Sequence, residues 1–173
     1  ARRAALQQAI ELKNYEFNAH GVELGQFYES SAVVSEPGGR PAPARDPELY
    51  YQPSTVPGSP LPHAWLGDNE HKWSTLDLAP STRFTIFTGI SGQPWAAAAA
   101  AVAAELGIEL GAVVVGPGRE VEDLYFDWAR LREIEEDGVL LVRPDKIIAW
   151  RSAGMVDDPA AALTAALRAV LSR

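Results

Sequence analysis

The spacing of apolar residues separates a helical beginning from an irregular middle and a regular second half. Within residues 2–18, Leu6, Ile10 and Phe17 recur at intervals of four and seven residues, which places them on one face of a helix. Gly21 is expected to close this segment. An isolated helix of this length is marginal in water. Its apolar face is therefore expected to lie on another part of this protein or of a longer one.

The middle of the chain lacks the periodicity of a regular element. A β-rich stretch over residues 28–34 predicts one short strand. Residues 35–62 then contain eight of the thirteen prolines, and proline removes the backbone donors that helices and sheets need. A structureless stretch of this length is typical of a linker or of an arm laid over a neighbouring surface. Tyr50, Tyr51 and Leu61 are candidates to anchor such an arm.

From Trp73 onward the pattern becomes regular, and the compact domain is expected to begin there. Residues 83–88 predict a strand, and residues 94–105 predict a helix that begins at a proline and is stopped by Gly107. The uninterrupted apolar run over residues 112–115 predicts a second strand that is parallel to the first and buried on both faces.

The remaining residues predict a helix, a hairpin and a final helix. The first helix is expected over residues 121–135. Two β-type runs, residues 138–143 and 147–151, are too close together for a crossover and therefore predict an antiparallel hairpin. The final helix begins at Pro159, and either of the two preceding aspartates can cap it.

The resulting order, βαβα followed by ββα, is the thioredoxin arrangement, because right-handed crossovers leave few other ways to fold it. The expected fold class is α/β, with a mixed central sheet and helices on both faces. An N-terminal helix and a long proline-rich arm precede this domain. The predicted division places the helix and arm in residues 1–72 and the thioredoxin-like domain in residues 73–173.

The composition of the chain excludes several classes of partner and of active site. The chain has 15 Lys and Arg against 23 Asp and Glu, a net charge of −8 and no basic block, so a nucleic-acid partner is not expected. It has no cysteine, which excludes disulfides, thiolate zinc sites and thiol nucleophiles. The turn at residues 89–94 lacks the dithiol of thioredoxins, and no proline precedes Gly138, where that fold carries its cis-proline. The expected domain is therefore inactive in redox chemistry.

Neither membrane insertion nor secretion is indicated. The longest apolar run, residues 95–104, has ten residues, whereas a transmembrane helix needs about 20. The first residues lack the apolar core and cleavage site of a secretory signal, and a cytoplasmic location is expected. Because the chain begins with Ala1 and not with Met, it is expected to be a piece of a longer protein.

One glycine motif is a candidate for dinucleotide binding. Residues 116–118 follow a predicted strand and precede a predicted helix, as a G-x-G-x-x-G fingerprint requires. However, Val121 replaces the last glycine, and Pro117 removes a backbone N–H from the phosphate cradle. A tight turn is the favoured interpretation.

Ser91 occupies a strand-to-helix turn like a nucleophile elbow, but Gln93 replaces the second glycine of G-x-S-x-G. All three histidines precede this serine, so it is interpreted as a loop serine. The same turn also lacks the Lys and Ser or Thr of a phosphate-binding loop.

Further side chains receive structural interpretations. His63 and His71 flank two acidic residues, but their spacing fits no common zinc site, so they are interpreted as surface or loop-anchoring histidines. The five tryptophans are interpreted as core and interface packing. The acidic run between Glu133 and Asp137 is interpreted as a solvated face. No catalytic, cofactor-binding or metal-binding residue is therefore assigned.

Along its whole length, the chain resembles the C-terminal part of class A FAD-dependent aromatic hydroxylases, especially their phenol and chlorophenol monooxygenases. The matching blocks are residues 15–17, 21–26, 28–32, 57–58, 61–66, 74–78, 84–85, 88–90, 115–118, 123–125, 127–128, 138–145 and 149–151. One departure is Lys146 in the hairpin turn, where relatives often have Gly or another turn former.

This resemblance implies a much longer parent enzyme that uses NAD(P)H to reduce FAD and adds one oxygen atom ortho to a phenolic hydroxyl. In that family the FAD fingerprint and the phenol pocket lie upstream, so no catalytic residue carries over to this chain. The resemblance implies a non-catalytic domain with a docking, structural or oligomerisation role beside the upstream FAD-binding and substrate domains. The chain alone is expected to be inactive and to bind neither FAD nor NAD(P)H.

The alternative is a stand-alone, redox-inactive, thioredoxin-like binding module. A reading frame upstream with an FAD fingerprint would favour the hydroxylase domain, whereas a start codon just before Ala1 would favour the module. The identity of the phenol, the choice between NADH and NADPH, and the oligomeric state are left open.

Overall fold

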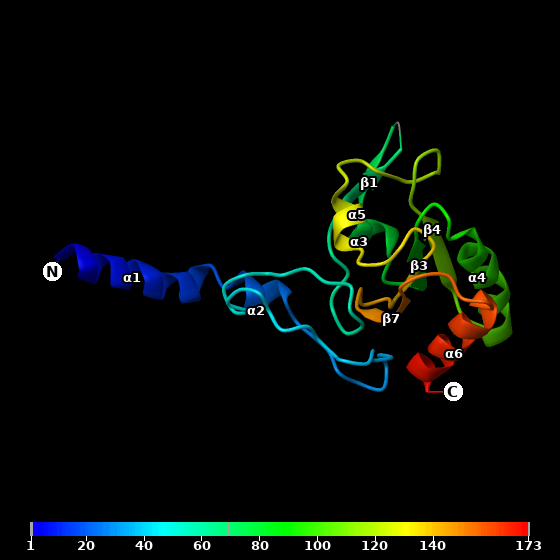
Figure 1. The fold of residues 1–173 in the computed structure, drawn as a ribbon, viewed down its shortest axis with the longest axis horizontal. Helices are drawn as coiled ribbons and strands as arrows, with labels where there is room; N and C mark the ends of the chain where they lie inside the picture. Colours follow the sequence, from blue (N-terminus) through cyan, green and yellow to red (C-terminus); the bar gives the residue numbers. More distant parts are fainter. Residues whose placement is uncertain (1, 69, 173) are drawn as a thin grey trace.

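The computed structural model describes residues 2–68 and 70–172. Two helices, α1 (Arg2–Phe17) and α2 (His20–Leu24), precede a long irregular segment, and the remaining elements form a globular domain. Figure 1 shows α1 extending away from this domain as a rod, with α2 between them. The N-terminal helix predicted from the apolar spacing is confirmed.

The centre of the domain is a mixed sheet of four strands in the order β4-β3-β6-β7. β3 (Phe84–Thr88) pairs in parallel with β4 (Leu110–Val114) and antiparallel with β6 (Val139–Val142), which forms a hairpin with β7 (Ile148–Ser152). The two parallel strands and the hairpin are therefore confirmed. The predicted burial of the second strand on both faces is wrong, because β4 lies at the edge of the sheet and only Val113 in it is buried. Every residue of β6 is buried, because both faces of the sheet are covered.

One face of the sheet carries α4 (Gln93–Leu106) and α6 (Pro159–Leu171), which lie side by side in Figure 1. Proline stands in the first turn of both helices, where its missing N–H leaves no bond unmade. Gly107 ends α4 in the left-handed conformation, and the Asp158 side chain accepts a hydrogen bond from the Ala161 N–H at 2.9 Å. The expected stop and cap residues are thus confirmed, with Asp158 as the cap.

The other face carries a second layer built from short elements. β1 (Trp65–Gly67) pairs with β2 (Lys72–Ser74) and with β5 (Glu122–Asp123). The short helices α3 (Thr75–Leu78) and α5 (Asp127–Leu131) complete this layer. Buried residues of this core cluster include Leu66 from β1, Phe87 from β3 and Trp128 from α5.

Three local predictions are wrong. The predicted helix over 121–135 is replaced by the edge strand β5 and the single-turn helix α5, with left-handed residues at Phe126 and Glu133. Residues 28–34 form turns and no strand. Gly21 does not cap α1; it lies buried inside α2, where a Cβ would stand 1.9 Å from the Pro47 carbonyl oxygen.

Packing also begins upstream of residue 73, where the compact domain is predicted to start. Val56 is buried, and Leu61, Ala64 and Leu66 belong to the same core cluster as the central strands. The end of the proline-rich stretch is therefore part of the domain's hydrophobic core.

Candidate functional site

The proline-rich arm, residues 35–62, is exposed at first and buried at its end. Its last residues pair with the start of the edge strand β7 and with the turn before it. The Gly58 N–H donates to the Ile148 carbonyl at 2.8 Å, and the Ile148 N–H donates to the Ser59 carbonyl at 2.9 Å. The Leu61 N–H donates to the Lys146 carbonyl at 2.8 Å. These bonds satisfy the backbone groups of Ile148 at the start of the edge strand β7 and one carbonyl of the turn before it.

Gly58 fits this edge because it has no side chain. Its φ is +102°, and a Cβ there would lie 2.5 Å from the Tyr28 carbonyl oxygen. The Gly58 carbonyl also accepts a 2.9 Å hydrogen bond from the Tyr28 N–H. The backbone of residues 28–34 is thus held at one end by the arm and at the other by β7, where the Val34 N–H donates to the Ala149 carbonyl at 2.8 Å.

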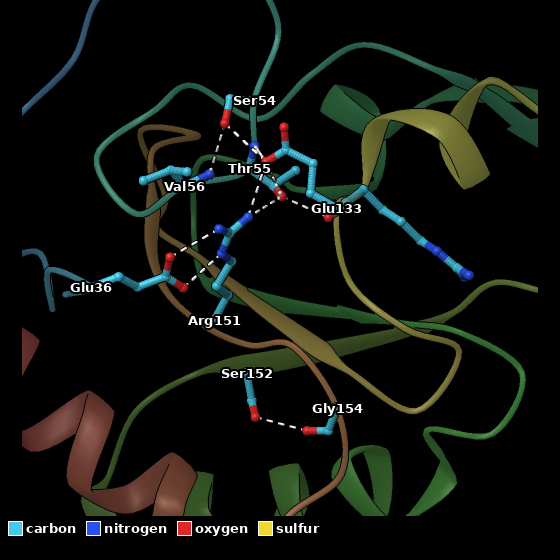
Figure 2. Close-up of polar contacts among 9 residues, drawn as sticks. Glu36, Ser54, Thr55, Val56, Glu133, Arg151, Ser152 and Gly154 are labelled. Carbon is cyan, nitrogen blue, oxygen red and sulfur yellow. Dashed lines mark hydrogen bonds and ion pairs between the residues drawn. The ribbon is translucent and has the colours of Figure 1, made fainter. Parts of the chain in front are cut away.

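Arg151 on β7 anchors the arm at a second point, shown in Figure 2. Its Nε and Nη2 atoms contact the two carboxylate oxygens of Glu36 at 2.7 and 2.9 Å. Its Nη1 atom donates to Glu133 and to the Thr55 hydroxyl, both at 3.0 Å. This side chain is only 14% exposed, so its charge needs both carboxylates.

Electrostatics explain why Arg151 stays charged. Burial alone would lower the pKa of its guanidinium, but hydrogen bonds and charges from Glu36 and Glu133 more than offset this and raise the pKa above its ordinary value. Glu133 in turn accepts hydrogen bonds from the Ser54 hydroxyl at 2.9 Å and from the Thr55 N–H at 3.0 Å. The Thr55 hydroxyl donates to the Arg132 carbonyl at 2.6 Å.

The acidic run is exposed as interpreted, with the Glu133 and Glu136 side chains 39% and 53% exposed, but both side chains also form ion pairs. Glu133 binds Arg151 and the arm, and Glu136 forms an ion pair with Arg132 at 2.6 Å. The hydrogen bond from Arg132 lowers the pKa of the Glu136 carboxyl. Sequence reasoning misses this network because Glu36 and Arg151 are 115 residues apart, and no spacing pattern links them.

The glycine turn at residues 116–118 is a tight turn that uses its own backbone donor. The Gly118 N–H donates to Glu122 Oε1 at 2.7 Å, and Gly118 has a left-handed φ of +70°. Arg119 donates from Nη2 to the Ile90 carbonyl at 3.0 Å. The turn therefore does not present a free cradle of N–H groups to a phosphate.

Ser91 lies exposed at the turn before α4, and its N–H donates to the Glu136 carbonyl at 3.2 Å. In the described part of the chain, neither a histidine nor a carboxylate contacts its hydroxyl. The geometry of a nucleophile with a neighbouring base is not assembled there.

The two histidines of the β1–β2 region, His63 and His71, contact different neighbours. His63 Nδ1 lies 2.8 Å from the hydroxyl of Ser74, which is the N-cap of α3, and His63 therefore ties the loop before β1 to that helix. His71 Nδ1 lies 3.3 Å from Asp68, and its ring stacks on Trp73 at 5.4 Å between centroids. Across residues 2–68 and 70–172, no three His, Asp or Glu side chains converge as a metal site.

The tryptophans divide between core and surface. Trp95 and Trp128 are fully buried on opposite faces of the sheet, and Trp95 contacts Trp150 edge-on with ring centroids 5.8 Å apart. Trp65 is half-exposed, with the Lys72 ammonium 4.4 Å from its ring centroid. Core packing is thus established for the two buried rings.

α1 carries exposed apolar side chains. Leu6, Ile10 and Phe17 are 62%, 52% and 73% exposed, and no described residue of α1 is buried. A hydrogen bond from the Tyr15 hydroxyl to Asp46 at 2.7 Å ties the helix to the arm. No helix in the described part of the chain is long and apolar enough to cross a membrane.

Comparison with known proteins identifies long enzymes as relatives. The chain is 62% identical over 162 residues to phenol 2-monooxygenase of Pseudomonas sp. (strain EST1001), an alignment that covers 94% of this chain and 27% of that protein. It is 50% identical over 173 residues to 2,4-dichlorophenol 6-monooxygenase of Delftia acidovorans, with 99% and 29% covered. The chain thus spans less than a third of the length of these relatives.

Solved structures of two flavin-dependent enzymes have the same fold as this chain over most of its length. The flavin-dependent monooxygenase PieE, in complex with FAD and substrate, superposes with a TM-score of 0.89 and 45% identity, covering 99% of this chain and 29% of that one. Aklavinone-11 hydroxylase, in a ternary complex with FAD and aklavinone, has a TM-score of 0.75 and 37% identity, with 87% and 27% covered. Residues 54–173 match the family described as aromatic-ring hydroxylase, C-terminal. The chain therefore belongs to this family of aromatic-ring hydroxylase C-terminal domains.

Proposed function

We propose that this chain is the non-catalytic C-terminal domain of an FAD-dependent, NAD(P)H-using monooxygenase that hydroxylates phenols ortho to the hydroxyl group, as the names of its phenol and chlorophenol relatives suggest. The observation that carries the proposal is the 62% identity to phenol 2-monooxygenase across nearly the whole chain. The likeness to PieE over 99% of the chain, α1 included, gives independent support.

The domain supports this reaction through structure and not through chemistry of its own. In the proposal, its four-stranded sheet is a thioredoxin-like core, supported by the strand order β4-β3-β6-β7 and by the crossover helix α4 between two parallel strands. With no cysteine in the chain, this core has no dithiol to oxidise. Its contribution is a rigid body that carries the arm and α1.

The described residues do not fit an FAD site. The turn at 116–118 follows a strand, but Pro117 lacks an N–H and the Gly118 N–H is already bonded to Glu122. In the proposal, FAD and the phenol lie on domains upstream in the same polypeptide. No step of the hydroxylation is assigned to a residue of this chain.

We assign docking onto the flavin-binding neighbour to α1. Leu6, Ile10 and Phe17 form an apolar stripe that the domain leaves uncovered. Burying each such side chain against a neighbour stabilises the contact by roughly 1.5–3 kcal/mol. The hydrogen bond from Tyr15 to Asp46 and the anchor at Arg151 would transmit this docking to the domain through the arm.

The test uses the full-length polypeptide, assayed for bound FAD and for phenol-dependent oxidation of NADH and NADPH. A triple variant, Leu6→Ser, Ile10→Ser and Phe17→Ser, is expected to lose FAD on gel filtration and to oxidise NAD(P)H more slowly. The matched control places three serines on the opposite side of the helix, as Ala4→Ser, Gln8→Ser and Glu11→Ser, and should behave like the parent. Unchanged FAD retention in the first variant would exclude the docking role, and an absence of flavin from the parent would exclude the enzyme assignment.

A further inference from the structure

The two edges of the central sheet differ in how they are covered. The start of β7 pairs with the arm, whereas β4 forms the other edge and has only β3 as a neighbour. Residues 110–115 contain neither a charged residue nor a proline, and the register between β3 and β4 runs without a bulge. Charges, prolines and bulges are the features that keep an edge strand from pairing, so β4 is open to another extended strand.

The hydrogen bonds between β3 and β4 determine which backbone groups of β4 point outward. The Phe84 N–H donates to the Glu109 carbonyl at 3.2 Å, and the Val115 N–H donates to the Thr88 carbonyl at 2.9 Å. In a parallel pair, alternate residues of each strand form these bonds, so residues 109, 111, 113 and 115 face β3. The residues between them direct their N–H and C=O groups to the open edge.

Leu110 and Ala112 are the outward-facing residues at the centre of this edge. In the described part of the chain, the backbone of neither residue has a hydrogen-bond partner, and Ala112 is exposed. Further along, the chain covers its own edge, because the Gly116 N–H donates to the Val121 carbonyl at 3.0 Å. The open part is therefore short and is centred on Gly111.

Two copies of this edge match each other about a two-fold axis at Gly111. In an antiparallel pair, two residues that lie directly opposite can exchange both of their backbone hydrogen bonds. With the axis at Gly111, Leu110 of each copy lies opposite Ala112 of the other. Each copy offers two N–H and two C=O groups, so four hydrogen bonds pair all of them. Such a contact uses the same surface on both copies and therefore closes as a dimer.

The helix above this edge also favours a second copy. α4 packs on β3 and β4, and its Glu105 forms an ion pair with Arg168 of α6 at 2.9 Å. The buried residues of α4 face the sheet, so helical spacing places a row of alanines on the side turned away from α6. These are Ala96, Ala100 and Ala103. Their small side chains carry no charge and allow two helices to approach closely.

We propose that β4 pairs antiparallel with β4 of a second copy of this chain. The two four-stranded sheets then form one sheet of eight strands, with the two α4 helices side by side on one face. A second copy is the partner because the free backbone groups and the alanine row match themselves about the same axis. This dimer does not rest on the proposed function, and its absence would leave that function standing.

The size and charge of this contact indicate that it is weak. One short strand and one side of a helix bury less than the roughly 800 Å² per partner of stable complexes, so a dissociation constant of about 0.1 mM is expected. Like charges oppose the contact, because each copy has a net charge of −8 and Arg83 lies over Gly111, with its Nε 2.7 Å from the position of a Cβ there. Salt screens such repulsion, so added salt should strengthen the dimer.

The test follows the exchange of backbone amides with water by NMR on the ¹⁵N-labelled chain. The Leu110 and Ala112 amides are expected to exchange about fourfold more slowly at about 1 mM than at about 0.02 mM protein, by mass action with the dissociation constant above. The Gly111 and Val113 amides, which are bonded to β3, are the internal control and should exchange slowly at both concentrations.

Two substitutions and a matched control separate this contact from others. Ala112→Lys places a charge at the centre of the edge and should abolish the concentration dependence at the Leu110 amide. Ala100→Lys places a charge in the alanine row and should weaken the dimer about tenfold. The control is Ala169→Lys at an exposed position of α6, which should leave the dimer unchanged.

Self-association through α1 is separated by a further variant. The triple substitution Leu6→Ser, Ile10→Ser and Phe17→Ser should give the same slowing at the edge amides, because α1 takes no part in this contact. Loss of the slowing in this variant would mean that the copies associate only through α1, and would overturn the proposal.

Three other outcomes would overturn it. The first is equally fast exchange of the Leu110 and Ala112 amides at both concentrations. The second is slow exchange of these amides at both concentrations, which would mean that the edge is closed within one copy. The third is a slowing that persists in Ala112→Lys and Ala100→Lys. If Ala112→Lys does not fold, Ala100→Lys decides, because it changes an exposed helical position.

Discussion

At the scale of single residues, Arg151 connects three distant parts of the chain. Glu36 comes from the beginning of the arm, Thr55 from its end, and Glu133 from the loop after α5. A guanidinium suits this position because its planar set of donors can contact two carboxylates and a hydroxyl at once. A lysine could not make the bidentate contact with Glu36.

Replacement of Arg151 by Gln is expected to lower the free energy of unfolding by about 2 kcal/mol, because two partly buried carboxylates lose their counter-charge. Urea denaturation followed by circular dichroism measures this change. The matched control is Arg168→Gln, whose pair with Glu105 is half exposed on both sides, and its expected cost is about 0–1 kcal/mol. Equal effects of the two substitutions would contradict an anchoring role for Arg151.

The lowered pKa of the Glu136 carboxyl predicts that the free energy of unfolding depends on pH. Its pKa is lowered from the ordinary 4.5 by the hydrogen bond from Arg132, so its contribution to stability is complete above pH 4.5 and is lost as the pH falls through its folded-state pKa. Urea midpoints measured between neutral pH and about pH 3 are expected to fall with acidity, and less steeply in Glu136→Gln. A variant with the same acid slope as the parent would show that this carboxyl does not contribute.

At the scale of elements, the sequence predicts those whose pattern is local. The strand at 139–142 is an uninterrupted apolar run, and the strand at 84–88 consists of aromatic and β-branched residues. The helices at 93–106 and 159–171 begin at a proline, and the first of them ends at a glycine. The predicted helix over residues 121–135 does not form, because tertiary contacts override the helical pattern. There β5 pairs with β1, and Trp128 is buried against the sheet.

The candidate site is less predictable than the fold. The exposed stripe of α1 follows from helical periodicity, and the structure confirms that it is uncovered. The Arg151 anchor depends on contacts between residues far apart in the chain, for which a single sequence carries no signal. The role of Lys146, whose ammonium donates to the carbonyls of Leu76 and Ala79 at 2.6 and 3.0 Å, is of the same kind.

The packing of Leu61, Ala64 and Leu66 predicts where an independent domain can begin. A truncated protein of residues 54–173 is expected to melt cooperatively. One of residues 73–173 should not, because it lacks three side chains that are at most 3% exposed. Calorimetry of the two proteins distinguishes these cases. A cooperative transition in residues 73–173 would instead support the predicted division at residue 72.

At the scale of the whole molecule, the chain combines a packed domain with an exposed helix that stands apart from it (Figure 1). An apolar stripe of this kind favours contact with another surface at high concentration. In the absence of the flavin-binding neighbour, the chain is expected to self-associate through α1. Sedimentation velocity should show a concentration-dependent mass that becomes monomeric in the Leu6→Ser, Ile10→Ser, Phe17→Ser variant. A monomer at all concentrations would contradict this expectation.

The hydrogen bonds between the arm and β7 also affect how the protein would exchange strands between copies and aggregate. Without Gly58 and Ser59 beside it, Ile148 at the start of β7 would offer an unpaired N–H and C=O group to another strand. Because the arm is joined to the domain by irregular chain, the arm of one copy could occupy the same edge in a second copy with identical contacts. Damage to the Arg151 anchor should therefore lead to exchanged dimers and aggregates before global unfolding, and its mutants should be recovered from cells mainly as insoluble protein.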